Sequence, residues 1–201
     1  MITIESTLHL ERVTGLSITE FLLNCTDERY QQWWPGTHRR FHVRTQGREH
    51  LGDTVFMEEY IGNRHVRMAG TVVDVVPGRR IVWQLKRVVR LPVWLTLELT
   101  DRDGAVAIRH TIRAGYTGVG RLLDPLLRLY FTAEFTRAMD DHVHTEFPLL
   151  RDRILDPGPA TAAAPSGGRG ERVLPDPAEL FPARRAAAVR VGRRSGSRLP
   201  G

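Results

Sequence analysis

The 201-residue chain contains few of the residues that mark several common protein classes. Its single cysteine, Cys25, cannot form an intrachain disulfide, and no nearby His has the spacing of a catalytic pair, so we expect a buried structural thiol. No apolar run approaches the ~18 residues that cross a bilayer, and residues 1–12 lack the basic and apolar regions of a signal peptide. These absences favour a soluble cytoplasmic protein without a membrane span.

Motifs for nucleotide binding and for common hydrolases are also missing. The sequence has no Gly-rich phosphate loop, no GxSxG motif, no paired CxxC motif and no internal repeat. We therefore predict no nucleotide cofactor.

Positive charge is concentrated at one end of the chain. Residues 157–201 hold eight Arg against three acidic residues, a net charge of +5, which leaves +1 of the total +6 for residues 1–156. Because this segment is rich in Pro, Gly, Ala and Arg and poor in large apolar side chains, we predict a disordered basic tail after a single domain of residues 1–156. One aromatic residue and no dense basic block indicate no specific nucleic-acid partner.

Hydrophobic periodicity in residues 1–156 changes twice. Alternation of apolar residues, with turn signals between the runs, predicts strands over 2–12, 39–46, 52–61, 64–76, 79–88, 91–101 and 105–114. Two short helices are expected between the first two strands, one with a capping box that begins at Ser17 and one that begins at Thr26. Helical periodicity from Gly120 to about Leu155 predicts one long final helix.

This order of elements, β-α-α-β6-α, resembles the START-like (SRPBCC, polyketide cyclase) superfamily with its helix-grip fold. The resemblance covers nearly all of residues 1–156. It implies an α+β fold in which a curved antiparallel sheet of about seven strands surrounds a long C-terminal helix. Members bind lipids, hormones, polyketides or aromatic compounds between sheet and helix, so the expected partner is a small apolar or aromatic molecule. Because the superfamily includes carriers, cyclases and hydrolases, the fold alone does not give an activity.

Polar residues on faces predicted to be apolar are the candidates for chemistry. His142 and Glu146 lie one helical turn apart, on the face that also carries Phe135 and Met139, whereas His144 falls off that face. An ionised Glu on such a face is costly unless it is paired or bound to a metal. A plain buried His–Glu hydrogen bond is the alternative interpretation.

Two further residues can converge on this pair. His38 follows a rigid Pro35-Gly36 turn at the expected mouth of the cavity, where it is either a ligand or an incidental exposed residue. In the strand over 52–61, alternation places either Glu58 or Glu59 toward the interior, and the more uniformly apolar set favours Glu59.

Together, His38, Glu59, His142 and Glu146 suit a divalent ion such as zinc, with manganese and iron as alternatives. The set is similar to the metal site of the 2,4-diacetylphloroglucinol hydrolase branch of the superfamily. That resemblance implies a metal-dependent hydrolase, or a cyclase-like enzyme, that acts on an aromatic or polyketide-like ketone. The alternative is a non-catalytic carrier of a hydrophobic ligand without metal.

Four other residues are candidates for lining the ligand cavity. His110 shares a strand face with Val106, Ile108 and Ile112, and it is either a cavity residue or a satisfied core histidine. Aromatic residues that could shape the pocket, or could simply fill the core, are Trp83, Trp94 and Tyr130.

Overall fold

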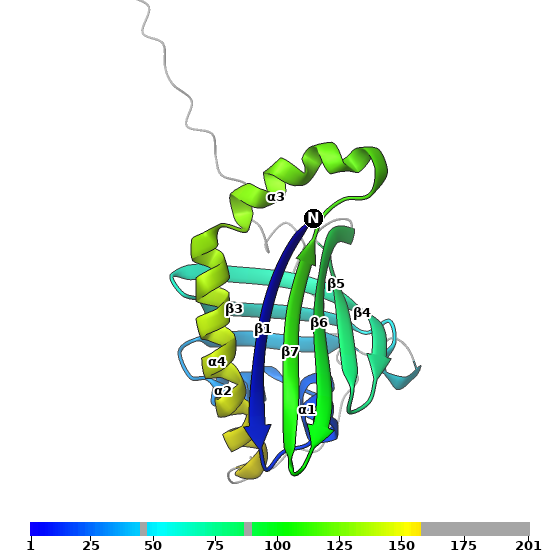
Figure 1. Ribbon diagram of the computed structural model, residues 1–201. Coiled ribbons are helices and arrows are strands. Elements are labelled where there is room, and N and C mark those ends of the chain that lie inside the picture. The colour runs from blue at the N-terminus through cyan, green and yellow to red at the C-terminus, as the bar shows by residue number, and fades with distance from the viewer. Residues whose placement is uncertain (45–47, 87–89, 158–201) are drawn as a thin grey trace, which may run out of the picture. The chain divides into compact units, whose positions relative to one another are not determined.

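Seven antiparallel strands form one curved sheet in the computed structural model, which describes residues 1–44, 48–86 and 90–157 (Figure 1). The strands are β1 (Ile2–Glu11), β2 (His38–Arg44), β3 (Thr54–Ile61), β4 (Arg64–Val76), β5 (Arg80–Lys86), β6 (Arg90–Arg102) and β7 (Ala105–Ala114). Their spatial order is β1-β7-β6-β5-β4-β3-β2, so β2 to β7 form a meander and β1 pairs with the last strand. The predicted α+β class and seven-stranded sheet are confirmed.

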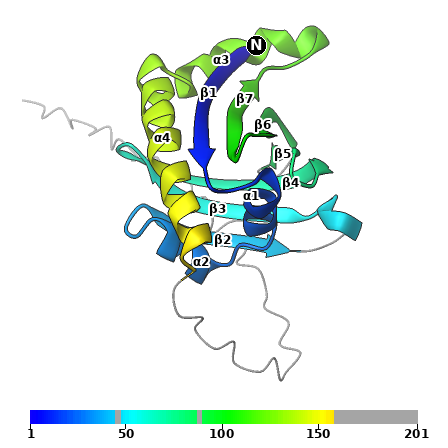
Figure 2. The same cartoon turned by 60° about the horizontal axis from the view of Figure 1, so that its bottom comes forward.

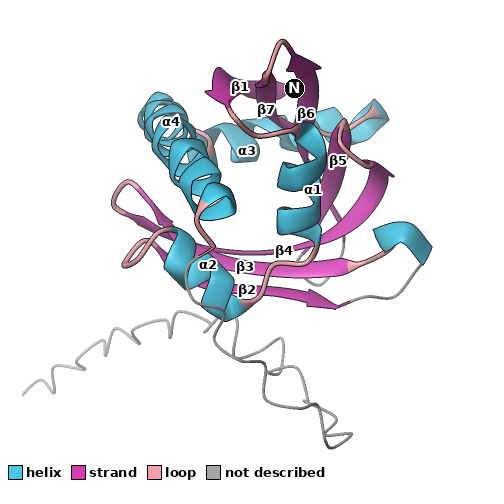
Figure 3. Cartoon of the chain, turned by 90° about the horizontal axis from the view of Figure 1, so that it is seen from below, coloured by secondary structure: helices cyan, strands magenta, loops and turns pink. Residues whose placement is uncertain are grey.

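Tight turns explain how successive strands pair. Between β6 and β7, Asp103 and Gly104 both adopt positive φ angles, of 46° and 80°, as a two-residue hairpin turn requires. Figure 3 shows that the sheet bends until β1, β7 and β6 face β2, β3 and β4, with β5 between the two walls.

Four α-helices and two 3-10 helices make up the other regular elements of the described residues. They are α1 (Gly15–Leu23), α2 (Asp27–Trp33), α3 (Asp124–Tyr130), α4 (Ala133–Leu155), η1 (Arg48–His50) and η2 (Gly118–Leu123). Helix α4 lies along the open side of the sheet, between its edge strands (Figures 2 and 3). Its buried residues Phe135, Met139, Val143, Phe147 and Leu150 recur every three or four positions and join the core inside the curved sheet.

Two predicted helix boundaries are wrong. The cap of α1 is Thr14, not Ser17, because the Thr14 hydroxyl accepts from the Ser17 amide while the Ser17 side chain reaches back to the Thr14 amide. The single helix predicted from Gly120 to Leu155 is divided into η2, α3 and α4. Thr132 is extended, with ψ at 164°, and its hydroxyl accepts from the amide of Phe135, which starts α4 as a separate helix.

None of the described helices is both long and apolar enough to cross a lipid bilayer. The predicted basic tail over 157–201 lies, apart from Pro157, outside the described residues and stays a prediction.

Candidate metal centre

His38 is placed by the junction of α2 and β2. Helix α2 ends at Trp33, the chain turns through Gly36 with φ at 84°, and the His38 amide then donates to the carbonyl of Trp34 at 3.0 Å. A bulge between His38 and Arg40 shifts the pairing with β3, and His38 thereby pairs with Glu59. The bulge therefore brings the first imidazole beside the first carboxylate.

The ring of His38 has a defined orientation. It stacks on the ring of Tyr30, with centroids 3.8 Å apart, and its Nδ1 lies 3.1 Å from the carbonyl oxygen of Tyr30. We assign the proton to Nδ1, because a carbonyl oxygen only accepts hydrogen bonds. In the neutral ring, Nε2 then carries a lone pair. This atom is buried, makes no hydrogen bond, and lies 3.3 Å from Glu146 Oε1 and 3.7 Å from Glu59 Oε2.

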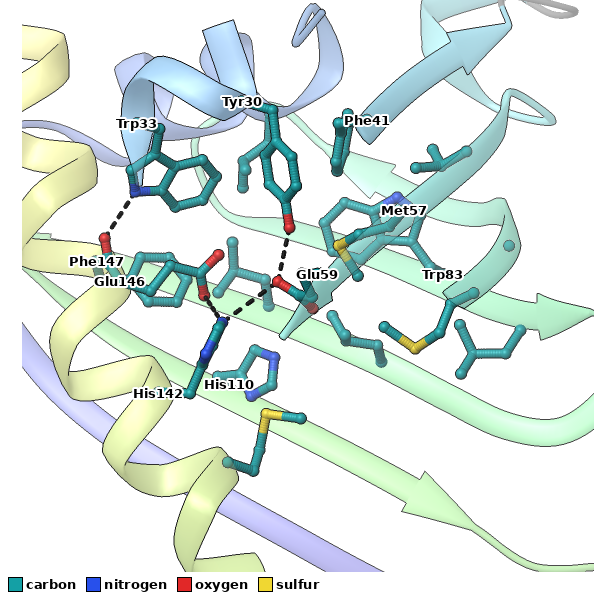
Figure 4. Close-up of a pocket in the computed structure, with 18 residues that line it drawn as sticks. Tyr30, Trp33, Phe41, Met57, Glu59, Trp83, His110, His142, Glu146 and Phe147 are labelled. Carbon is teal, nitrogen blue, oxygen red and sulfur yellow. Dashed lines mark hydrogen bonds and ion pairs between the residues drawn. The ribbon is translucent and has the colours of Figure 1, made fainter. Parts of the chain in front are cut away.

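Helix α4 supplies the second imidazole and the second carboxylate. His142 Nε2 lies 3.3 Å from Glu59 Oε2 and 3.7 Å from Glu146 Oε2, and it too is buried without a hydrogen-bond partner. The indole of Trp33 donates to the backbone oxygen of Glu146 at 2.8 Å and ties α4 to α2. Figure 4 shows His142 and Glu146 directed from α4 toward Glu59.

Interactions between the charges of this group shift the pKa values of His142 and Glu146 more than burial does. Burial disfavours the charged ring of His142, but the carboxylates of Glu59 and Glu146 raise its pKa. Burial also disfavours ionised Glu146, yet the imidazoles of His38 and His142 lower the pKa of this carboxyl. The environment therefore favours an anionic Glu146.

Tyr30 holds Glu59 in place. Its hydroxyl donates to Glu59 Oε2 at 2.7 Å inside the core (Figure 4). Burial, together with the nearby carboxylates of Glu59 and Glu146, raises the pKa of Tyr30 well above its ordinary value, so the phenol remains a donor.

Glu58 and Glu59 are neighbours on β3, and their side chains point to opposite faces of the sheet. Glu58 faces away from the cavity, where it accepts from His65 Nε2 at 2.8 Å and from Arg67. Although burial alone would raise the pKa of Glu58, His65, Arg67 and Arg40 lower it. Only Glu59 of the two points into the cavity.

These four side chains fit a divalent cation. One ligand atom from each of His38, Glu59, His142 and Glu146 lies within 4.8 Å of the other three. In a tetrahedral zinc site with ligands ~2.1 Å from the ion, neighbouring ligand atoms are about 3.4 Å apart. The imidazole–carboxylate separations of 3.3 and 3.7 Å are close to that value. His144 is exposed and lies outside the group.

An apolar cavity of about 90 Å³ adjoins this group (Figure 4). Its walls include Phe41, Met57, Met68, Leu95 and Met139 beside the polar residues Glu59, His142 and Glu146. This volume is small beside the ~300–1,000 Å³ of common ligand sites, so an enclosed ligand of one ring already requires side chains to move. Three of the lining residues are unbranched methionines, the most adaptable side chains in a core.

The structure places two of the four predicted lining residues at the cavity. Trp83 and His110 line it, and burial lowers the pKa of His110 and so keeps the ring neutral. Trp94 and Tyr130 do not line it. Trp94 shares its strand parity with Glu98, whose side chain is solvated on the outer face of the sheet, and Tyr130 is 48% exposed at the end of α3.

Comparison with known proteins identifies the fold. No family model matches the chain, and no curated protein matches its sequence. Among solved structures, protein TTHA0849 from Thermus thermophilus is 12% identical, with a TM-score of 0.52 over 77% of this chain and 97% of that one. Protein MLL2253 from Mesorhizobium loti is 10% identical, with a TM-score of 0.50 over 78% of this chain and 98% of that one. The chain has the START-like, helix-grip fold.

At these identities the likeness concerns the fold alone. Within this START-like fold, Tyr30 is the polar residue next to the four candidate ligands that the sequence patterns missed. A signal for it exists, because Tyr30 lies three residues before Trp33 on α2 and shares its buried face. Its hydrogen bond to Glu59 depends on how α2 packs against β2, the strand that pairs with β3, which no local pattern contains.

Proposed function

We propose that this START-like protein binds a small apolar or aromatic molecule between its sheet and α4. It also holds a divalent metal ion, for which zinc is the first candidate, at His38, Glu59, His142 and Glu146. One observation carries the proposal. Two buried imidazole nitrogens without hydrogen-bond partners face two carboxylates at the wall of an apolar cavity. A bound cation would satisfy all four groups, whereas burying them without one is costly.

The reaction that fits this site is hydrolysis of a ketone attached to an aromatic or polyketide-like ring. Water adds its oxygen to the carbonyl carbon, the bond from that carbon to the ring breaks, and the ring carbon takes up a proton. The products are a carboxylic acid and the ring without its acyl group. When bound, the metal would polarise the carbonyl and lower the pKa of a water molecule.

The side chains of the site have different roles in this reaction. Glu146, anionic and at the cavity wall, would leave the metal to take the proton of the attacking water and return it to the ring carbon, while His38, Glu59 and His142 hold the ion. Tyr30 keeps Glu59 oriented through their hydrogen bond. His110, whose Nδ1 has no hydrogen-bond partner, contacts a polar group of the ligand. Met57 and Met68 adjust to the shape of the ring.

A carrier without metal is the second candidate function. The observation that favours it is the composition of the cavity, since most of its lining residues are aliphatic, aromatic or methionine side chains. Such a surface binds an apolar molecule through burial alone and needs no reactive group.

Metal analysis distinguishes the two functions. We expect the purified protein to take up one zinc ion per chain and to lose this capacity in His142→Ala. His144→Ala is the matched control, because His144 lies on the same helix but is exposed and outside the ligand group. Protein that takes up no zinc, yet still binds apolar dyes, would identify the carrier. For the reaction, zinc-loaded protein should release carboxylic acid from an acylated trihydroxybenzene, and His142→Ala should not.

A further inference from the structure

Exposed apolar side chains gather at one end of the described structure. Twelve large hydrophobic residues of the described part are exposed, and six of them lie between residues 119 and 130. The most exposed are Val119 at 91%, Leu122 at 85%, Leu129 at 77% and Leu126 at 62%, here called the α3 ridge. Figure 1 shows that η2 and α3, which carry the ridge, stand off one end of the sheet. An exposed apolar group of this density marks an interaction site.

The spacing of the ridge gives it a single face. Its members follow one another by three, four and three residues, which aligns them along one side of a helical segment. The opposite side of the segment is already used, because Leu127 and Phe131 pack against the core. The ridge is therefore a second apolar face, and no part of the chain that the structure describes covers it.

Charge around the ridge is positive. Asp124 is the one acidic residue between positions 116 and 131, and its carboxylate accepts from the Tyr116 amide at 2.9 Å and from the Met1 ammonium at 3.0 Å. Arg121 and Arg128 are exposed, and neither forms an ion pair with any described residue. The ridge thus combines apolar side chains with two exposed cations, and its one anion is already paired with Met1 and Tyr116.

We propose that the α3 ridge docks this protein onto the surface of an anionic phospholipid membrane. The aliphatic side chains would enter the boundary between headgroups and acyl chains, while Arg121 and Arg128 meet lipid phosphates. A second copy of the chain fits less well. A symmetric contact through the ridge would gather the arginines of both copies with no free carboxylate of the segment to neutralise them.

Vesicle sedimentation with the full chain tests the proposal. The probes are phosphatidylcholine vesicles and mixed phosphatidylcholine–phosphatidylglycerol vesicles. The first variant combines Leu122→Ser, Leu126→Ser and Leu129→Ser, and its control is Leu51→Ser, at an exposed leucine of another loop. The second is Arg128→Gln, and its control is Arg137→Gln, an exposed helical arginine that likewise forms no ion pair with a described residue. Circular dichroism verifies that each variant is folded.

We expect wild type, Leu51→Ser and Arg137→Gln to sediment with the mixed vesicles and not with phosphatidylcholine alone. The triple variant should lose this binding, and Arg128→Gln should weaken it about fivefold, as the loss of one cation near an anionic surface predicts. Binding that the triple variant retains would overturn the proposal, because another basic part of the chain would then carry it. The proposal would also be overturned if the wild type did not bind vesicles, or if it formed a concentration-dependent dimer that the triple variant does not form.

Discussion

Substituting Tyr30 with Phe probes the proposed metal centre without altering any of its four proposed ligands. The Tyr30 hydroxyl donates to Glu59 Oε2 at 2.7 Å, and the change removes this one atom. The aromatic ring stays, and with it the stack on His38 at 3.8 Å and the edge contact with Trp33. Any effect on metal binding therefore reports how well Glu59 is held.

The expected loss can be worked out from that hydrogen bond. A hydrogen bond to a charged group contributes about 1.5–3 kcal/mol, and each 1.4 kcal/mol is a factor of ten, so zinc affinity should fall by about 10- to 100-fold. Partners of metal-binding side chains in other proteins have effects of the same size. The affinity is measured by competition with a fluorescent zinc chelator.

Tyr60→Phe is the matched control. Tyr60 is 39% exposed and stacks on His65, and its hydroxyl donates to no described residue. This variant should bind zinc like the wild type. If Tyr30→Phe also binds zinc with unchanged affinity, this hydrogen bond does not hold Glu59 for the metal, and the reasoning from Tyr30 to metal affinity is refuted.

Three other predictions concern the folded domain. Burial raises the pKa of Cys25 from 9.0 to about 12, so its thiol stays neutral at pH 9, where an unfolded thiol is half ionised. Alkylation by iodoacetamide at that pH should be about 500-fold slower in native protein than in urea, and equal rates would contradict the burial. Gly15→Ala should lower the free energy of unfolding by about 1–3 kcal/mol in urea titrations, because a Cβ there would lie 2.1 Å from the carbonyl oxygen of Gly78. Deletion of residues 157–201 should leave the melting temperature nearly unchanged in calorimetry, and a large drop would show that this segment packs on the domain.

Much of the fold could be predicted because its local signals agree with its tertiary contacts. Period-two alternation and turn residues such as Asp103-Gly104 predict strands that the sheet then pairs in sequence. The prediction failed where two local signals compete. Apolar periodicity continues across residues 131 and 132, but the hydroxyl of Thr132 starts a new helix there, and periodicity alone does not contain that capping interaction.

Only part of the candidate site could be predicted from the sequence in this way. Helical spacing brings His142 and Glu146 to one face, and strand parity favours Glu59, since both are properties of a single element. The position of His38 depends on a bulge in the pairing of β2 with β3, which is a property of two strands. The parity of β6 already separates Trp94 from Leu95 and Leu97, so a strict count of alternation would have placed Trp94 outside the cavity.

The four residues proposed to hold the metal lie far apart along the chain, and this separation has a consequence for biosynthesis. His38 and Glu59 lie on the first strands of the meander, whereas His142 and Glu146 lie on α4, the last described element. A nascent chain that has not yet released α4 from the ribosome possesses half of the centre and a sheet whose concave face is uncovered. Metal uptake would then be the last step of maturation, because it requires the helix that also closes the cavity. Only a completely folded domain would then contain the metal.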